Sequence, residues 1–184
     1  MVMKDIVVEN IVASTTLADQ LDLDAIALAL EGAEYEPEQF PGLIYRLKEP
    51  KTAMLIFRSG KANCTGAKNL EDVKTCIYTV RDMLEEAGID VYKNPEINVQ
   101  NMVAVYDLKT ELNLNAIAIS LGLENVEYEP EQFPGLVYRI YEPKVVMLLF
   151  GSGKVVCTGA RKMEDIETAV KMLRKELSNA GLLH

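Results

Sequence analysis

Residues 34–68 read EYEPEQFPGLIYRLKEPKTAMLIFRSGKANCTGAK, and residues 127–161 read EYEPEQFPGLVYRIYEPKVVMLLFGSGKVVCTGAR. The two stretches align without a gap and are identical at 25 of 35 positions. Self-similarity at a fixed spacing is the signature of a repeat architecture. This block therefore predicts a chain built from two copies of one structural unit.

The repeat extends beyond the block in both directions. After it, apolar residues recur at helical spacing up to Gly88 in the first copy and up to Gly181 in the second. We therefore predict two repeats, residues 1–93 and 94–184. Before the block, two further pairs of segments correspond: VENIVAS (8–14) with VQNMVAV (99–105), and LDAIALAL (23–30) with LNAIAISL (114–121).

Each repeat has the pattern strand, helix, several strands, helix. DIVVENIVA is rich in β-branched residues, and an apolar i, i+3, i+4, i+7 stripe follows in LDAIALAL. The runs GLIYRL, TAMLIFRS and KANCTG are short and of β type, with turn signals between them. A long amphipathic helix is expected from about residue 70 to residue 87, and Gly88 is suited to end it. The fold class is therefore α+β.

One face of the predicted sheet lacks an obvious cover. In TAMLIF (52–57) and VVMLLF (145–150) both alternating sets of side chains are apolar. Two helices per repeat can cover one face of the sheet. The other face would stay bare, and a large exposed apolar surface marks a binding site.

Composition limits the classes of function. The net charge is −9, the only histidine is His184, and the three cysteines form no CxxC pair. A zinc site, another metal site or histidine-based catalysis is therefore not expected, and no cofactor is predicted. Charges interrupt the first apolar segment, and no apolar run approaches a membrane span, so we expect a soluble protein of the cytoplasm without a membrane partner.

The chain has four phenylalanines and no tryptophan. Phe40 and Phe57 stand in the first copy, and Phe133 and Phe150 occupy the equivalent positions of the second. Rare, large side chains at matching positions in both copies suggest a shared task. Inheritance from a recent duplication is the alternative explanation.

Two asparagines also match across the repeat. Asn10 and Asn101 interrupt apolar strand runs, where an amide disfavours the strand and needs hydrogen-bond partners. Each is interpreted either as a polar contact on the open face or as a turn or bulge residue. Thr65 and Thr158 repeat in the same way within CTGA.

These paired motifs resemble the two direct repeats of the TATA-box-binding protein family in its archaeal form. The resemblance covers nearly the whole chain, because ENIV and QNMV, both EPEQFPGL blocks, and both SGK and CTGA segments occur in the order typical of the family. It implies a saddle, in which a curved ten-stranded antiparallel sheet carries four helices on its convex face. The implied function is general transcription initiation through the minor groove of the A·T-rich TATA box, with kinking of the DNA and no enzymatic activity.

The resemblance assigns a role to each repeated residue. The intercalating side chains would be Phe40, Phe57, Phe133 and Phe150. The minor-groove contacts would come from Asn10, Val12, Leu55, Thr65, Asn101, Val103, Leu148, Val156 and Thr158. The phosphate contacts would come from Arg46, Lys61, Lys68, Arg139, Lys154 and Arg161.

The resemblance also implies partners. Glu129 and Glu131 would bind transcription factor B, which would bring in RNA polymerase indirectly, and the protein would be associated with the nucleoid of a prokaryotic cell. An exposed apolar face would allow a homodimer when DNA is absent. Asn63 departs from the pattern, since the second copy has Val156 at the equivalent position.

Two other classes of function are weighed against this one. A protein- or lipid-binding module would use the same apolar face, but it leaves Asn10 and Asn101 unexplained. An enzyme would need Glu36, Glu38, Glu129 and Glu131 as paired carboxylates, or GSGK as a phosphate loop. Those glutamates lack a histidine or cysteine companion in the sequence, and GSGK lacks the spacing of a Walker loop.

Overall fold

The computed structural model describes residues 5–122 and 124–183. Within these residues the chain forms four helices and nine strands, in the order predicted for each repeat. The helices are α1 (Leu23–Ala29), α2 (Leu70–Glu86), α3 (Leu114–Leu121) and α4 (Met163–Asn179). The strands are β1 (Val7–Thr16), β2 (Leu43–Leu47), β3 (Thr52–Ile56), β4 (Lys61–Ala67), β5 (Asn98–Asp107), β6 (Val126–Glu127), β7 (Leu136–Tyr141), β8 (Lys144–Leu149) and β9 (Lys154–Ala160).

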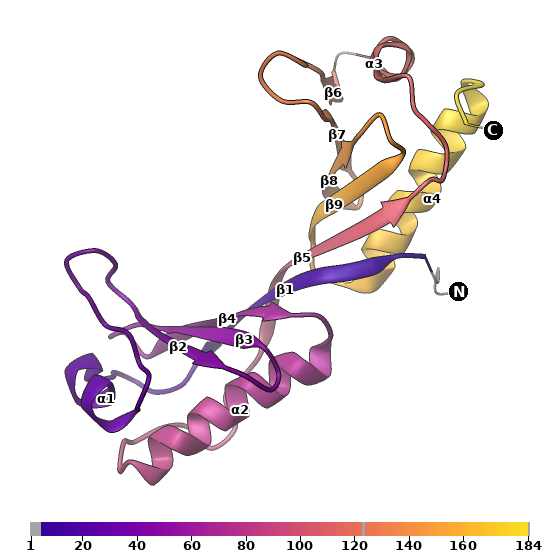
Figure 1. The fold of residues 1–184 in the computed structure, drawn as a ribbon. Helices are drawn as coiled ribbons and strands as arrows, with labels where there is room; N and C mark the ends of the chain where they lie inside the picture. Colours follow the sequence, from indigo (N-terminus) through magenta and orange to yellow (C-terminus); the bar gives the residue numbers. More distant parts are fainter. Residues whose placement is uncertain (1–4, 123, 184) are drawn as a thin grey trace. The chain divides into compact units, whose positions relative to one another are not determined.

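The chain divides into two compact units (Figure 1). We call residues 10–100 the N unit, and the described residues before 10 together with those after 100 the C unit. The unit boundaries fall inside β1 and β5, near their starts, so they differ from the repeat boundary predicted near residue 93.

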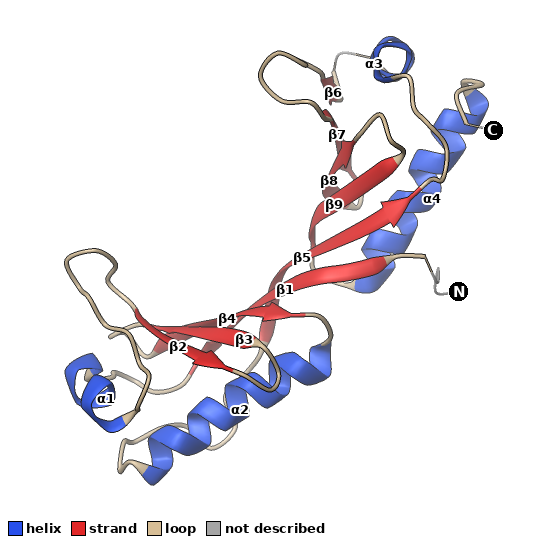
Figure 2. Cartoon of the chain, viewed as in Figure 1, coloured by secondary structure: helices blue, strands red, loops and turns tan. Residues whose placement is uncertain are grey.

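Both units have the same strand order, except that the C unit has one additional strand, β6. The N unit has the order β2-β3-β4-β1 and the C unit the order β6-β7-β8-β9-β5, with antiparallel pairing throughout each unit. In each unit the long helix lies along one side of the strands, α2 in the N unit and α4 in the C unit (Figure 2). The α+β class and the tandem repeats are confirmed.

The tenth predicted strand is reduced to one bridge. In the C unit, β6 pairs with β7 through two residues, whereas the N unit has only the isolated bridge Glu34↔Ile44 at the matching place. The cause is one hydrogen bond, because in the C unit the Arg139 N–H donates to the Asn125 carbonyl and completes the pairing of Val126 with Tyr138. Among the described residues of the N unit no equivalent bond joins Arg46 to Gly32, and the Ala33 N–H donates back to the Leu30 carbonyl in the turn after α1.

The core lies between the long helix and one face of the strands. In the N unit Met54 and Ile56 of β3 are fully buried, as are Val73, Ile77 and Val80 of α2. The alternate residues Leu55 and Phe57 are only half-buried. The C unit repeats this alternation in β8, so each unit has one covered and one open sheet face.

Both long helices end as the sequence predicts. Gly88 has φ of 84° and donates its N–H to the Glu85 carbonyl, and Gly181 has φ of 74°. A positive φ of this kind favours glycine after a helix. No helix in the described residues is long and apolar enough to cross a membrane. Within the same residues no cluster of three or more potential ligands could hold a metal ion.

Candidate nucleic-acid interface

Each unit holds one pair of phenylalanine rings on the rim of its open face. Phe40 and Phe57 have ring centroids 5.9 Å apart in an edge-to-face arrangement, and Phe133 and Phe150 are also 5.9 Å apart with the same arrangement. Phe40 is 36% exposed and Phe133 is 40% exposed. The structure therefore brings together the four rings as two equivalent pairs, one in each unit.

Local hydrogen bonds place the rings. In the EPEQF turn the Glu36 carbonyl accepts the N–H of Phe40 at 3.0 Å, and the Glu129 carbonyl accepts that of Phe133 at the same distance. Phe57 follows β3 directly and donates its N–H to the Lys61 carbonyl across the hairpin. The repeated segment EPEQFPGL thus brings the phenylalanine of its loop against the phenylalanine that follows the strand.

One glycine in each copy of EPEQFPGL makes room for the rings, Gly42 in the N unit and Gly135 in the C unit, and neither was predicted from the sequence. A Cβ atom on Gly42 would lie 2.8 Å from Phe40 Cε2 and 2.9 Å from Phe57 Cε1. On Gly135 it would lie 2.7 Å from Phe133 Cε2 and 2.9 Å from Phe150 Cε1. The identical FPGL in both copies was the available signal, but only the coordinates show that the missing side chain makes room for the ring pair.

The open face of the C unit is almost wholly apolar. Strand register aligns Val105, Val156, Leu148 and Val137 in one row across four strands. All four are half-buried. Val103 precedes this row on β5 and is half-buried too. The surface is therefore flat and apolar without being part of the core.

The same row in the N unit contains two polar residues. It consists of Ser14, Asn63, Leu55 and Ile44, at the positions of the four C-unit residues. Val12 is half-buried on β1, like Val103 on β5. The expected contact residues Val12, Leu55, Val103, Leu148 and Val156 therefore all lie on the open faces of their units.

Asn10 and Asn101 make the same hydrogen bonds in their respective units. The Asn10 Oδ1 accepts the N–H of Gly66 at 2.6 Å, and its Nδ2 donates to Thr65 Oγ1 at 3.3 Å. The Asn101 Oδ1 accepts the N–H of Gly159 at 2.7 Å, and its Nδ2 donates to Thr158 Oγ1 at 3.3 Å. A shift of strand register follows each asparagine, so the bulge interpretation and the open-face interpretation both describe it.

This geometry turns each asparagine into a donor. The backbone N–H holds the amide oxygen, whereas the amide nitrogen has a second hydrogen. The minor-groove edge of an A·T pair offers only acceptors, adenine N3 and thymine O2. A G·C pair adds the guanine N2 amino group, which is itself a donor. The oriented amide therefore suits A·T pairs.

The predicted phosphate contacts fall into two groups. Arg46 pairs with Glu34 at 2.7 Å, and Arg139 lies 3.4 Å from Glu127, so both guanidinium groups already have carboxylate neighbours. The other four predicted phosphate contacts are exposed and form no ion pair within the described part of the chain. They are Lys61, Lys68, Lys154 and Arg161.

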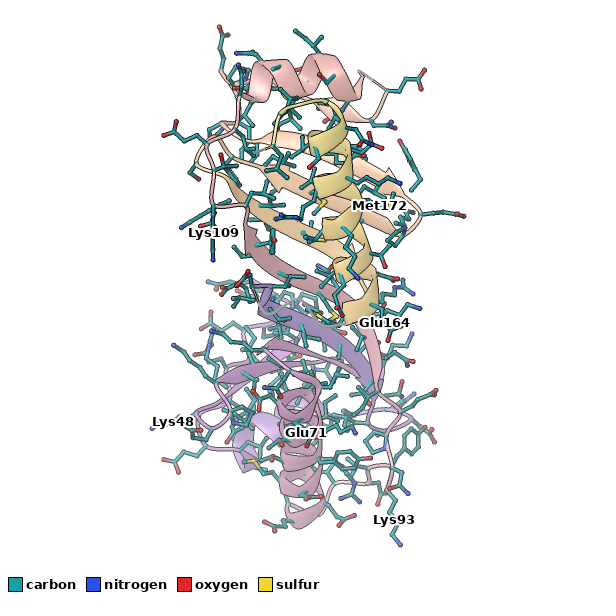
Figure 3. All side chains as sticks on the ribbon, turned by 90° about the vertical axis from the view of Figure 1, so that its right-hand side faces the viewer. Lys48, Glu71, Lys93, Lys109, Glu164 and Met172 are labelled. Atoms are coloured by element: carbon teal, nitrogen blue, oxygen red, sulfur yellow. The ribbon has the colours of Figure 1, made fainter. Side chains whose placement is uncertain are left out.

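Most acidic side chains of the long helices lie on the outer surface. Figure 3 labels Glu71 on α2 and Glu164 on α4, both exposed. Glu167 differs, because it is 9% exposed within the packed side of α4. The EPEQ loops add exposed carboxylates, Glu36 and Glu38 in the N unit and Glu129 and Glu131 in the C unit. Negative charge is thus concentrated on helices and loops, while the half-buried positions of the open faces are apolar or uncharged except for Asp107 at the end of β5.

The fold and the open faces together define a class of protein. Paired rings at a rim, flat apolar rows and amide donors beside them are the features of a tandem-repeat α+β protein suited to the minor groove of DNA. The family model for transcription factor TFIID, or TATA-binding protein, matches residues 5–87 and 96–180.

Similar proteins agree with this match. The chain is 71% identical over 181 residues to the TATA-box-binding protein of Picrophilus torridus, covering 98% of each chain. It is 71% identical over 178 residues to that of Thermoplasma acidophilum, covering 97% of each. The solved structure of Methanococcus jannaschii TBP matches with a TM-score of 0.87 at 55% identity, covering 95% of this chain and 99% of that one.

The chain belongs to the TATA-binding protein family. The relatives named here are archaeal, as the resemblance implied. The family consists of DNA-binding transcription factors rather than enzymes, which removes the paired-carboxylate interpretation of the EPEQ glutamates.

Proposed function

We propose that this protein is a general transcription initiation factor that binds the minor groove of the A·T-rich TATA box and kinks the DNA. The observation that carries the proposal is the presence of one exposed phenylalanine pair in each unit, with the same 5.9 Å separation. Two equivalent wedges suit a duplex that is kinked at two places. We further propose that the chain is organised as two repeats, residues 1–93 and 94–184, each of which supplies one wedge.

The energetic balance of intercalation favours paired rings. Unstacking one base step costs architectural minor-groove proteins, this family among them, about a few kcal/mol. Burying one phenylalanine side chain returns roughly 1.5–3 kcal/mol. Because Phe40 and Phe133 are already more than one-third exposed, that burial is still available on binding. Two rings at each kink therefore offset the cost.

On the open face of each unit, the asparagine amide would contact the base edges. Asn10 with Thr65, and Asn101 with Thr158, would donate to adenine N3 and thymine O2. The apolar rows would exclude water around them. The exposed cations Lys61, Lys68, Lys154 and Arg161 would meet phosphates, joined by Arg46 and Arg139 once these leave their carboxylate neighbours.

Recruitment would use the loop of the C unit. Glu129 and Glu131 are exposed beside Phe133, and they would accept hydrogen bonds from basic residues of transcription factor B. That factor would then bring RNA polymerase to the promoter. In this role the protein would be associated with the nucleoid of a prokaryotic cell.

A mobility-shift assay tests the proposed function. A short TATA-containing duplex is compared with the same duplex carrying G·C pairs, using the wild type, Phe57→Ala and Phe150→Ala. We expect binding of the TATA duplex alone, and roughly tenfold or greater weakening by each substitution, since one ring contributes about 1.5–3 kcal/mol. Ile119→Ala is the matched control, because Ile119 is a large apolar residue of α3 that is 83% exposed.

Two outcomes would contradict the proposal. One is equal affinity for both duplexes. The other is an unchanged affinity for the TATA duplex after both ring substitutions, which would favour a face that binds protein or lipid.

A further inference from the structure

The open faces of the two units differ most at one position. Asn63 of β4 stands where Val156 of β9 stands in the C unit, and both side chains are half-buried. Asn63 pairs with Leu55 on one side and with Ser14 on the other. Ser14 in turn corresponds to Val105. A polar pair in the N unit thus replaces a valine pair in the C unit.

A third polar side chain, Gln100, is hydrogen-bonded to Ser14 of this pair. Gln100 Nε2 donates to Ser14 Oγ at 2.8 Å. This bond orients the glutamine so that its Oε1 remains an acceptor, and the serine hydroxyl keeps its own hydrogen to donate. In the described part of the chain no hydrogen bond engages the Asn63 side chain, so its amide oxygen is available as an acceptor.

These residues also line a depression. A groove of about 810 Å³ in the N unit is lined by Ser14, Asn63 and Gln100, together with Phe57, Lys61 and Tyr92. The polar set therefore lies beside the strand ring Phe57, on the face that the proposed function places against DNA. It has room for an additional group from a base edge.

The chemistry of the minor groove identifies that group. Guanine differs from the A·T edge by one exocyclic N2 amino group, which needs an acceptor. Val156 and Val105 have none, and an amino group buried against them would lose its hydrogen bonds to water. Asn63 Oδ1 and Gln100 Oε1 are acceptors on the equivalent surface.

We propose that Asn63, supported by Ser14 and Gln100, is a specificity-determining residue that accepts the guanine N2 amino group, so that the N unit tolerates a G·C pair that the C unit rejects. This inference rests on the proposed function. Its consequence is a polarity: an element with a single G·C pair at the relevant position is bound with that pair against the N unit.

A self-complementary A·T element provides the test. A single G·C substitution at either of two symmetry-related positions gives the same duplex, and the protein can choose the orientation that places the pair against Asn63. A double substitution forces one G·C pair against Val156. Affinities are measured for the unsubstituted, single and double duplexes, with the substitution moved through the element.

At one position we expect the wild type to bind the single duplex within about threefold of the unsubstituted one, and the double duplex at least about tenfold more weakly, as for an ordinary mismatched pair. Asn63→Val should weaken the single duplex by about the same factor. Val156→Asn should restore binding of the double duplex. Each variant only copies the residue of the other repeat, and thermal unfolding of each variant verifies that the fold is intact.

Orientation gives a second readout. A donor dye on Lys171→Cys, an exposed position of α4, and an acceptor on one DNA end report which end the C unit faces. The three native cysteines are buried, so labelling is selective. On the single duplex the wild type should bind in one orientation and Asn63→Val in both equally.

The inference is overturned if the wild type and Asn63→Val lose the same affinity on the single duplex at every position, or if both show the same orientation. Absence of wild-type binding to the unsubstituted element would instead contradict the proposed function, so the two failures are distinguishable.

Discussion

The substitution Gly135→Ala tests whether the seating of the ring pair matters for DNA binding. The added Cβ would lie 2.7 Å from Phe133 Cε2 and 2.9 Å from Phe150 Cε1. Carbon atoms at ordinary contact are about 3.5–4.0 Å apart. One or both rings must therefore move by about 1 Å, and the edge-to-face arrangement is lost.

The expected magnitude follows from burial of the displaced ring. If one ring no longer enters the base step, roughly 1.5–3 kcal/mol of binding free energy is lost. This corresponds to about a 10- to 150-fold weaker affinity for the TATA duplex. Gly42→Ala should have a similar effect in the N unit, where the distances are 2.8 and 2.9 Å.

The free energy of unfolding should stay unchanged or increase slightly in these glycine-to-alanine variants, although their DNA affinity falls. Neither glycine has a positive φ, so alanine is compatible with the backbone. A compatible Gly→Ala change stabilises a fold by about 0.4–1 kcal/mol through the unfolded chain. The loop ring is exposed and can shift without opening the core. The melting temperature should therefore remain close to that of the wild type.

The assay is a titration of a TATA duplex by fluorescence anisotropy, with thermal unfolding measured on the same samples. Gly151→Ala is the matched control, because its nearest neighbour would be a backbone oxygen at 3.9 Å and the other repeat has Arg58 there. The reasoning is refuted if Gly135→Ala binds like Gly151→Ala, or if its loss of affinity is accompanied by a comparable loss of stability.

Four further predictions follow from the geometry and the charges. Asn101→Asp keeps an acceptor for the Gly159 N–H but replaces the amide donors with a negative charge. The affinity for the TATA duplex should therefore fall at least about tenfold while the circular dichroism spectrum stays unchanged. An unchanged affinity would show that Asn101 is not a donor to the DNA. Glu127→Gln frees Arg139, which should raise affinity at low salt, and the gain should disappear in the double variant Glu127→Gln/Arg139→Gln. The wild-type affinity should fall with KCl less steeply than six phosphate contacts alone would require, because a protein of net charge −9 releases few counterions net; the full slope of a basic binder with six contacts would contradict that. Burial raises the pKa of Cys157 to about 11, so its thiol stays protonated at neutral pH and should react with iodoacetamide only after unfolding, which mass spectrometry of the labelled peptide would check.

The repeat, the α+β class and the open face could be predicted from periodicity alone. TAMLIF has apolar residues on both alternating faces, and a helix in each unit covers only one of them, which is what the structure shows for Met54 against Leu55. The rings and asparagines were identified because they recur at matching positions. Structural features can therefore be predicted from the sequence when they follow a regular period or recur in both repeats.

Features that depend on close approach could not be predicted in the same way. The need for glycine at positions 42 and 135 arises from two rings that are distant in sequence from each other. The pairing of Arg46 with Glu34 depends on the bend that follows α1, and the tenth strand is missing because the described part of the N unit has no counterpart of the bond from the Arg139 N–H to the Asn125 carbonyl. Each is decided by a single contact, which leaves no period in the sequence.

The way the two units divide the chain affects the order in which they can fold. The N unit is one continuous segment, residues 10–100, whereas the C unit joins residues before 10 to residues after 100. Completing the C unit therefore closes a loop that contains the whole N unit, and this closure carries an entropic cost that grows with loop length. We therefore expect pulse-labelled hydrogen exchange during refolding to show α2 protected before α4. Simultaneous protection of both helices would argue for a single folding step.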